Sequence, residues 1–359
     1  MSYHNLIFFV WASSVLATSM ARTGNAAAFA PSLPKVHLRA PKVVILPTAS
    51  GRQRTVMPWF TATALKGGEK QNLVVNYHFL RTCNYACKFC FHTAKTSHIA
   101  PLEDAMKALQ ILVNHGMTRI NFSGGEPFLQ EHHLGELIKY CKEVLGIKTS
   151  IVSNGSLMRE NWFYTYGKYL DALAISCDSF DSDTLDAIGR GDGKRNAGGR
   201  HLEQLKFIKA WCGEYNVTFK INSVVCRENV EEDMFKEILD LRPERWKVFQ
   251  CLLIGGENAG ADAKHNAGAQ VVSDAEFAAF VERHSICDEM LVPESNAAMR
   301  NSYLILDEYL RFLDNTSGVK KPSSVNVLED VRQALSESGF DSVMFKQRGG
   351  EWSTKKLEW

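Results

Sequence analysis

Three cysteines follow a short apolar run in one stretch of the chain, Asn76-Tyr-His-Phe-Leu-Arg-Thr-Cys83-Asn-Tyr-Ala-Cys87-Lys-Phe-Cys90-Phe-His92. Three residues separate the first pair of cysteines and two separate the second pair. Thiolates this close together must converge on a metal centre or repel one another, and iron–sulfur clusters are held by cysteine thiolates, normally four. The stretch therefore predicts a [4Fe–4S] cluster on Cys83, Cys87 and Cys90, with one iron left for a substrate or cofactor.

A zinc site, with His92 as the fourth ligand, is the alternative interpretation of the same cysteines. Zinc sites usually combine two paired halves separated by a longer loop, and this sequence has no second half. The other six of the nine cysteines are scattered through apolar or helical contexts, which argues against a disulfide framework. Free thiols of this kind are typical of proteins from a reducing compartment.

From residue 73, short apolar strands alternate with longer amphipathic helices. Strands are expected at 73–80, 119–122, 149–153, 172–176, 218–223 and 246–250. Helices are expected at 102–114, 132–145, 160–166, 201–215, 231–239 and 274–284. Such repeats form parallel sheets with right-handed crossovers, and six units are too few for a closed eight-fold barrel. The sequence therefore predicts an α/β fold, a partial (βα)6 barrel, with its chemistry at the C-terminal ends of the strands.

Two of the expected strands carry cations that share a direction. Lys220 and Asn222 alternate to the same face of one strand, and Arg245 and Lys247 do so on the next. Charged side chains inside a barrel are costly unless an anion pairs with them; the alternative is that they face helices or solvent, as most Lys and Arg do. Because Arg and Lys suit phosphate oxygens, these residues predict an anion site. The later run Lys346-Gln-Arg348 could close over it, or form a solvated basic tail.

Composition sets the broad class of the protein. Of the 359 residues, 45% are hydrophobic and 23% are charged, as in an ordinary globular protein. The net charge of +1 gives no general attraction to nucleic acid, so no nucleic acid is expected as a partner. The pattern divides the chain into an apolar segment and linker at 1–72, a core at 73–285 and an extension at 286–359 that closes the site.

The cysteine stretch resembles the signature of the radical S-adenosylmethionine (SAM) superfamily, with Phe89 as the aromatic residue before the last cysteine. The resemblance implies that the open iron of the cluster chelates the methionine part of SAM. One electron then cleaves SAM and leaves a 5′-deoxyadenosyl radical, which abstracts a hydrogen atom from the substrate. The implied cofactors are a [4Fe–4S] cluster and SAM, and an electron donor is an implied partner.

Polar loops follow the next three strands. The run Gly124-Gly125-Glu126-Pro127 resembles the superfamily motif that binds the amino group of SAM. Its glycines let a ligand approach the backbone closely, and Glu126 can accept a hydrogen bond from an ammonium group. Ser153 and Asn154 resemble the loop that meets the SAM ribose region, and Arg190 matches a superfamily residue near SAM. Ser176 could serve the ribose or cap the next helix.

The resemblance becomes more specific in Asn76-Tyr-His-Phe and in Trp246-Lys-Val-Phe-Gln-Cys-Leu-Leu-Ile254, which look like viperin-like enzymes. Such enzymes convert CTP to 3′-deoxy-3′,4′-didehydro-CTP, by removal of the C4′ hydrogen and loss of water from C3′, and some relatives use UTP or GTP. The product terminates viral RNA chains, so the resemblance implies a pyrimidine triphosphate substrate, CTP or UTP, and an antiviral role in innate immunity. It also implicates Asn76, Arg119 and Tyr303 at the nucleotide, with Arg119 standing where lysine is expected.

Residues 5–21 form an apolar segment, and here the similarity to viperin-like enzymes fails. The uncharged run Leu6–Leu16 is shorter than the roughly 20 residues that a spanning helix needs. It could be a signal sequence, a short membrane anchor or an interfacial helix, and the lack of Lys or Arg before it favours membrane attachment over secretion. We expect the protein at the cytosolic face of the endoplasmic reticulum membrane, or in the cytoplasm.

Two other functions fit parts of the sequence. A radical SAM enzyme that acts on a peptide or another small molecule often has a C-terminal cysteine-rich region, which the dispersed Cys226, Cys251 and Cys287 do not resemble. A non-enzymatic interaction scaffold would bind zinc rather than iron and would not cleave SAM.

Overall fold

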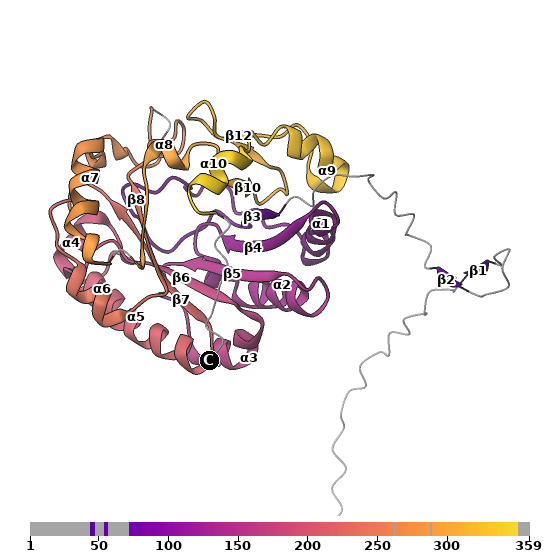
Figure 1. The fold of residues 1–359 in the computed structure, drawn as a ribbon, viewed down its shortest axis with the longest axis horizontal. Coiled ribbons are helices and arrows are strands. Elements are labelled where there is room, and N and C mark those ends of the chain that lie inside the picture. The colour runs from indigo at the N-terminus through magenta and orange to yellow at the C-terminus, as the bar shows by residue number, and fades with distance from the viewer. Residues whose placement is uncertain (1–43, 47–53, 57–71, 262, 288, 351–359) are drawn as a thin grey trace, which may run out of the picture. The chain divides into compact units, whose positions relative to one another are not determined.

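The computed structural model of the protein describes residues 44–46, 54–56, 72–261, 263–287 and 289–350 (Figure 1). Residues 1–66 form a separate unit, whose described part is an antiparallel pair, β1 (Val44–Leu46) and β2 (Arg54–Val56). The apolar segment 5–21 lies outside the described residues, so its membrane contact stays a prediction. Within the described ranges, no helix combines the length and apolar character that a membrane crossing requires.

Eight parallel strands build the sheet of the larger unit, in the order β10-β3-β4-β5-β6-β7-β8-β9. They are β3 (Leu73–His78), β4 (Met117–Ser123), β5 (Lys148–Ser153), β6 (Ala172–Ser176), β7 (Thr218–Val225), β8 (Arg245–Gln250), β9 (Leu291–Glu294) and β10 (Leu304–Leu306). The sheet curls into a partial barrel with helices around its outer face (Figure 1). The expected α/β fold is confirmed, and all six predicted strands are present.

The two edge strands go beyond the six that the sequence predicts. β9 contains Pro293, which cannot donate to a strand ladder and is tolerated at the edge of a sheet. β10 has three residues, too few for an alternating pattern to be recognised. β9 pairs with β8 and β10 pairs with β3, so residues 291–306 carry the chain from one edge of the sheet to the other.

Up to residue 284 the helices follow the predicted positions with one addition, and three further helices that were not predicted lie after that residue. They are α1 (Leu102–Asn114), α2 (Glu131–Glu143), α3 (Glu160–Tyr166), α4 (Ser182–Ile188), α5 (Ala197–Glu214), α6 (Phe235–Leu241), α7 (Asp274–Arg283), α8 (Asn296–Met299), α9 (Val327–Ser336) and α10 (Ser342–Gln347). The addition is α4, where the Asp181 side chain accepts the Thr184 backbone N–H at 2.7 Å as the N-cap. Ser176 therefore does not cap the next helix, which corrects one of its two expected roles. A short hairpin, β11 (Leu313–Asp314) and β12 (Lys321–Pro322), lies between β10 and α9 in the chain.

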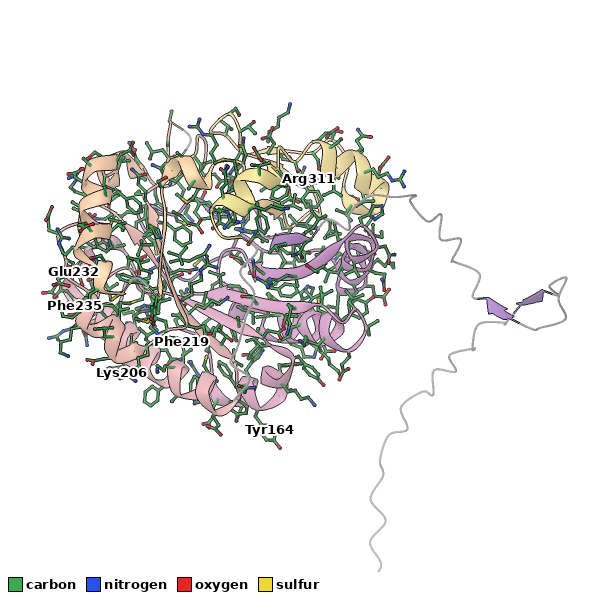
Figure 2. All side chains as sticks on the ribbon, in the orientation of Figure 1. Tyr164, Lys206, Phe219, Glu232, Phe235 and Arg311 are labelled. Carbon is green, nitrogen blue, oxygen red and sulfur yellow. The ribbon has the colours of Figure 1, made fainter. Side chains whose placement is uncertain are left out.

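Alternation along the strands separates an apolar outer face from a polar inner face. On β3, Val75 and Tyr77 are fully buried in the core between sheet and helices, whereas Asn76 and His78 line an inner cavity. On β7, Phe219 points toward α5, where Lys209 Nζ lies 6.0 Å from its ring centroid (Figure 2). The inner-face residues of the central strands all line the same cavity: Val74, Asn76, His78, Arg119, Asn121, Ser123, Ser150, Val152, Ala174, Ser176, Lys220, Asn222, Val224, Arg245, Lys247 and Phe249. The core thus lies outside the curled sheet, and the inside is available for ligands.

Candidate active site

One cavity follows the inner face of the curled sheet, and its two ends differ in chemistry. Cysteine sulfurs and small polar groups line it at the C-terminal ends of the strands. Cationic side chains line it toward the N-terminal halves of β4, β7 and β8. Every residue predicted for the site lines this cavity except Glu126. The strand-end rule therefore locates the cysteine end but not the cations, which lie deeper in the barrel.

The cysteine end is built on the loop that follows β3. Cys87 is buried, Cys90 is half-buried and Cys83 is exposed, and none of the three is in a disulfide. The backbone N–H of Tyr85 donates to Cys83 Sγ at 3.4 Å, and Asn154 Nδ2 lies 3.9 Å from the same sulfur. Such N–H donors stabilise a thiolate, so the loop suits sulfur ligands of a cluster.

The pKa values of the cysteines at this end determine how metal binding depends on pH. Burial raises the pKa of the Cys87 thiol to about 12, and desolvation by the surrounding loops raises that of Cys83 to about 11 although part of its surface is exposed; the nearby Arg190 guanidinium partly opposes both shifts. Both residues are therefore neutral thiols in the free protein at pH 7, and iron must displace their protons on binding. Metal binding here should release protons and weaken as the pH falls.

The positions of the cysteines and of His92 bear on the choice between a cluster and a zinc ion. Among the described residues, no three His, Cys, Asp or Glu side chains stand close enough together to hold a single metal ion. A [4Fe–4S] cluster bonds each cysteine to a different iron, so its ligands stand farther apart than those of one zinc. His92, the fourth ligand of the zinc alternative, is instead 2.9 Å from Lys320 Nζ through its Nδ1. The arrangement fits the cluster.

The two glycines after β4 allow two loops to approach each other. A Cβ on Gly125 would lie 1.9 Å from the carbonyl oxygen of Thr82, and one on Gly124 would lie 2.3 Å from that of Leu80. The Gly125 N–H donates to the Leu80 carbonyl at 2.8 Å. Gly124 also has a φ of +145°, which L side chains rarely adopt. These glycines were expected to let a ligand approach the backbone closely. The structure shows that they also let the backbone of the cysteine loop approach closely.

Replacing Gly125 with Ala should therefore disturb the cysteine loop. Overlap with backbone cannot be relieved by side-chain movement, so we expect a cost of about 3 kcal/mol in stability and less iron bound after reconstitution. Chemical unfolding and iron content would measure both effects. Gly213→Ala in α5 is the matched control, because no atom lies within 4 Å of its added Cβ and alanine favours a helix by about 1 kcal/mol. A Gly125→Ala protein with normal iron content and stability would contradict this explanation.

Glu126 holds the same loops together from behind the cavity wall. Its side chain is fully buried, and its Oε1 accepts the Ser153 hydroxyl at 2.7 Å and the Phe128 N–H at 2.9 Å. Its Oε2 accepts the Asn154 N–H at 2.8 Å. Burial raises the pKa of this carboxyl, and the three donors oppose the rise. Glu126 thus links the loops after β4 and β5 and does not line the cavity.

Arg190 joins the cysteine end through a buried ion pair. Its Nε donates to Asp178 Oδ2 at 2.6 Å, and Asp178 Oδ1 accepts the Val224 N–H at 2.9 Å. The guanidinium lies 5.8 Å from the Phe89 ring centroid. Burial lowers its pKa, but Asp178 and Cys87 together raise it further, so Arg190 stays charged. The sequence indicated Arg190 by resemblance only. Its partner Asp178 lies in the loop that follows β6, two residues after the strand ends.

Five cationic side chains line the opposite end of the cavity: Arg119, Lys220, Arg245, Lys247 and Arg348. Burial lowers the pKa of Lys220 to about 7, and the neighbouring Arg245, Arg119 and Lys247 act in the same direction. Burial likewise lowers the pKa of Lys247 to about 8, against the attraction of Glu294. Cations so placed repel one another, and a polyanion in the cavity would relieve that repulsion.

Glu294 organises part of this cationic end, and the sequence analysis did not single it out. Its carboxylate accepts Lys247 Nζ, and Arg348 Nη1 at 3.3 Å. The Tyr303 hydroxyl donates to Glu294 and accepts from Lys247 Nζ at 3.1 Å, and the Arg348 guanidinium stacks 3.7 Å from the Tyr303 ring centroid. Although burial raises the pKa of Glu294, Lys247 and Arg348 hold it below its usual range. The predicted Tyr303 and Arg348 are thus brought together with Lys247 by one carboxylate.

Asn76 and Asn121 connect the two ends. Asn121 Nδ2 donates to Asn76 Oδ1 at 3.0 Å, and Asn76 Nδ2 contacts the Leu304 carbonyl at 3.4 Å. Both side chains line the cavity on neighbouring strands, so they present amide groups to a ligand that spans it. Asn121 lies three residues before Gly124, and the inner-face alternation of β4 was the signal that could have found it.

A buried ion network braces the loop behind the cysteines and was not predicted. Arg81 donates from Nε to Glu308 at 2.8 Å and from Nη1 to Glu257 at 3.0 Å. Glu257 also accepts the Thr93 N–H at 3.0 Å and lies 3.8 Å from Lys320 Nζ. The network ties the cysteine loop to segments after β8 and β10, so these distant segments help to position it.

Comparison with known proteins agrees with this architecture. Residues 77–197 match the Radical SAM superfamily. Streptococcus suis SuiB bound to S-adenosylmethionine superposes with a TM-score of 0.56 at 18% identity, over 78% of this chain and 68% of that chain. The structure of native anSMEcpe with bound AdoMet and Cp18Cys peptide gives 0.53 at 16% identity, over 80% and 86%. At these identities the likeness concerns the fold alone. Fold, superfamily match and cysteine spacing agree that this is a radical SAM enzyme, which uses a [4Fe–4S] cluster and SAM.

Relatives of known name define the family more narrowly. S-adenosylmethionine-dependent nucleotide dehydratase RSAD2 of Oncorhynchus mykiss is 54% identical over 79% of this chain and 82% of its own length. The protein of the same name from Danio rerio is 55% identical over 79% and 80%. A relative from Flammeovirga pacifica named S-adenosylmethionine-dependent nucleotide dehydratase is 34% identical over 78% and 96%. The chain belongs to the S-adenosylmethionine-dependent nucleotide dehydratases, the viperin type of radical SAM enzyme.

Proposed function

We propose that this enzyme converts a pyrimidine ribonucleoside triphosphate, CTP or UTP, to its 3′-deoxy-3′,4′-didehydro analogue. The names of its relatives support a nucleotide substrate and the loss of water. The observation that carries the triphosphate is the set of five cationic side chains at one end of a cavity whose other end holds three cysteines. A nucleoside or a monophosphate carries too few negative charges to match this set.

The cysteine end is assigned to the cofactors. Cys83, Cys87 and Cys90 hold the cluster, with Phe89 packed beside them. Ser153, Asn154, Ser176 and Arg190 hold SAM, supported by the Gly124-Gly125 loop that Glu126 fastens. When bound, the cluster and SAM would supply the 5′-deoxyadenosyl radical that takes the C4′ hydrogen; departure of the C3′ hydroxyl with a proton as water, and gain of one further electron from the donor, would then give the product.

The cationic end is assigned to the triphosphate. Arg119, Arg245 and Arg348 suit bidentate phosphate contacts, and Lys220 and Lys247 act as point charges. With the phosphates held here, Asn76 and Asn222 face the ribose, which is thereby directed toward the cysteine end. The cavity wall keeps bulk water away from a reactive radical.

An anaerobic assay tests this proposal. Iron-reconstituted enzyme, dithionite and SAM are incubated with each of the four ribonucleoside triphosphates, and 5′-deoxyadenosine and nucleotide products are followed by mass spectrometry. We expect CTP or UTP to stimulate 5′-deoxyadenosine release and to lose the mass of one water. Slow release of 5′-deoxyadenosine that no triphosphate changes would refute the substrate assignment and leave the radical SAM assignment intact.

The biological setting belongs to the same proposal. A 3′-deoxy nucleotide cannot be extended, so the product would stop RNA synthesis by a viral polymerase, an antiviral function in innate immunity. Segment 5–21 would attach the enzyme to the cytosolic face of the endoplasmic reticulum membrane. A fluorescent fusion that remains in the cytosol would contradict that attachment.

A further inference from the structure

A second hollow lies on the outer side of the cysteine loop. It takes its residues from that loop, from the segment after β5, and from the loop and helix α5 that follow α4. The lining residues are Asn84, Tyr85, Ser156, Leu157, Arg159, Asp192, Ala197, Arg200, His201, Gln204, Phe207 and Trp211. We call this hollow the outer groove. None of these residues was assigned a role above except Tyr85, whose N–H donates to Cys83.

The outer groove and the inner cavity share a wall that is one loop thick. Tyr85 lines both, and its neighbour Asn84 lines the groove while Cys83 lines the cavity. Hydrogen bonds cross the wall: Asn84 Nδ2 donates to Ser156 Oγ at 2.9 Å, and Asn154 Nδ2 is 3.0 Å from Asn84 Oδ1 and 3.9 Å from Cys83 Sγ. Cys83 is the exposed member of the three cysteines. The groove is therefore a place where a partner outside the protein comes close to a cluster sulfur.

The floor of the groove is aromatic. Phe207 and Trp211, one turn apart on α5, stack with ring centroids 6.3 Å apart, and Phe207 is 59% exposed. Tyr85 and the buried His201 meet edge to face, with centroids 6.2 Å apart. Exposed aromatic groups with arginine around them are the usual composition of the centre of a protein interface.

The rim of the groove is basic. Arg159 and Arg200 line it and are exposed, and Lys194 and Arg195 lie in the adjoining loop, also exposed. The one acidic lining residue, Asp192, is already paired with Arg200 at 2.6 Å and with Lys194 at 3.8 Å. Among the lining residues, Arg159 and Arg200 outnumber the one carboxylate, which is already paired, and this excess of positive charge favours a partner with an acidic surface. Figure 2 shows Lys206, the residue before Phe207 on α5, at the outer surface of the helix layer.

We propose that the outer groove is the docking site for an acidic one-electron donor protein that reduces the cluster. The inference rests on the proposed function, because only radical SAM chemistry requires this electron. The donor loses one electron and the cluster gains it, without proton transfer or bond cleavage in the donor. The electron crosses the wall at Cys83 and Tyr85, so reduction can occur while nucleotide and SAM fill the inner cavity.

Charge reversal at the rim tests the proposal in the reconstituted full-length enzyme. Arg159→Glu and Arg200→Glu are compared with Lys107→Glu on α1, an exposed lysine whose helix contributes nothing to the groove. Phe207→Ala is a further variant that removes only an exposed ring. Release of 5′-deoxyadenosine is measured with dithionite, and separately with reduced flavodoxin, an acidic protein donor, at low and high salt. The Kd of oxidised flavodoxin for each variant is measured in parallel; the arginine variants and Phe207→Ala should raise it about tenfold at low salt, and an unchanged Kd would overturn the docking site.

We expect both arginine variants and Phe207→Ala to lose about tenfold in the flavodoxin-driven rate at low salt, with the dithionite-driven rate unchanged. Lys107→Glu should resemble the unmodified enzyme in both arms. Equal flavodoxin-driven rates in all variants would overturn the docking site. So would parallel losses with dithionite, or a failure of flavodoxin to support the unmodified enzyme. Loss of the dithionite reaction in the unmodified enzyme would instead refute the proposed function.

Discussion

Simultaneous replacement of Cys83, Cys87 and Cys90 by Ala will give a folded, colourless protein that does not cleave SAM. Without thiolates there is no ligand set for the iron, because such clusters are held by cysteine sulfur. The cysteines lie on a loop outside the strands, and Cys83 is exposed, so the loss should be specific to the cluster. Absorbance of the reconstituted protein, iron content and 5′-deoxyadenosine release would measure it.

Cys141→Ala provides the matched control for this prediction. Cys141 is a fully buried cysteine of α2 in the core outside the sheet, so its replacement removes a thiol without touching the cavity. It should keep the brown colour and the activity at a modest cost in stability. A triple variant that still binds iron and cleaves SAM would refute the cluster assignment.

Replacement of Lys220 by Met should raise the KM for the triphosphate by about 10- to 100-fold, because a charge-assisted hydrogen bond is worth about 1.5–3 kcal/mol. Methionine keeps most of the volume of the buried side chain, so the cavity should not collapse. Iron content and the slow release of 5′-deoxyadenosine without nucleotide should stay unchanged. Steady-state kinetics with the preferred triphosphate would give KM and kcat separately.

Lys142→Met is the control for the same substitution, since Lys142 on α2 pairs with Asp171 and lies outside the cavity.

Triphosphate binding should also be coupled to proton uptake by the enzyme. Below pH 7 Lys220 is already charged in the free enzyme; above its pKa of about 7 it is neutral, and a bound polyanion raises that pKa. Triphosphate affinity should therefore fall as pH rises from 7 to 9, with proton uptake seen by calorimetry at pH 8. Unchanged triphosphate affinity and unchanged proton uptake in Lys220→Met would contradict the assignment of Lys220 to the triphosphate site.

The inner cavity was largely predictable because it is built from local patterns. Each strand from β3 to β8 is an apolar run bounded by polar turns, and alternation fixes which residues face inward. Alternation therefore placed Lys220 and Lys247 each on one face of its strand, and the structure shows that both faces line the same interior. The cysteine spacing is local as well, so the cluster loop could be recognised from the sequence.

What the sequence concealed depends on contacts between distant segments. Glu294 has no local pattern in Leu-Val-Pro-Glu, and its partner Lys247 lies 47 residues earlier. Arg81 and Glu308 are separated by 227 residues, and no periodicity connects them. The close contact that requires Gly125 was hidden for the same reason, because the atom involved belongs to Thr82 on another loop.

The pairing of β10 with β3 has a consequence for synthesis on the ribosome. The cysteine loop and its glycine partner lie within residues 80–126, so they can meet early on the nascent chain, before Glu257 and Glu308 are present to brace the loop. The free edge of β3 must wait until Leu304–Leu306 has emerged, and Glu294, Tyr303 and Arg348 arrive equally late. An unpaired strand edge attracts other chains during that delay, which makes chaperone protection valuable at this stage. Under the proposed function, this order would also protect the cell, since an incomplete polypeptide would lack Tyr303 and Arg348, which are proposed to hold the substrate.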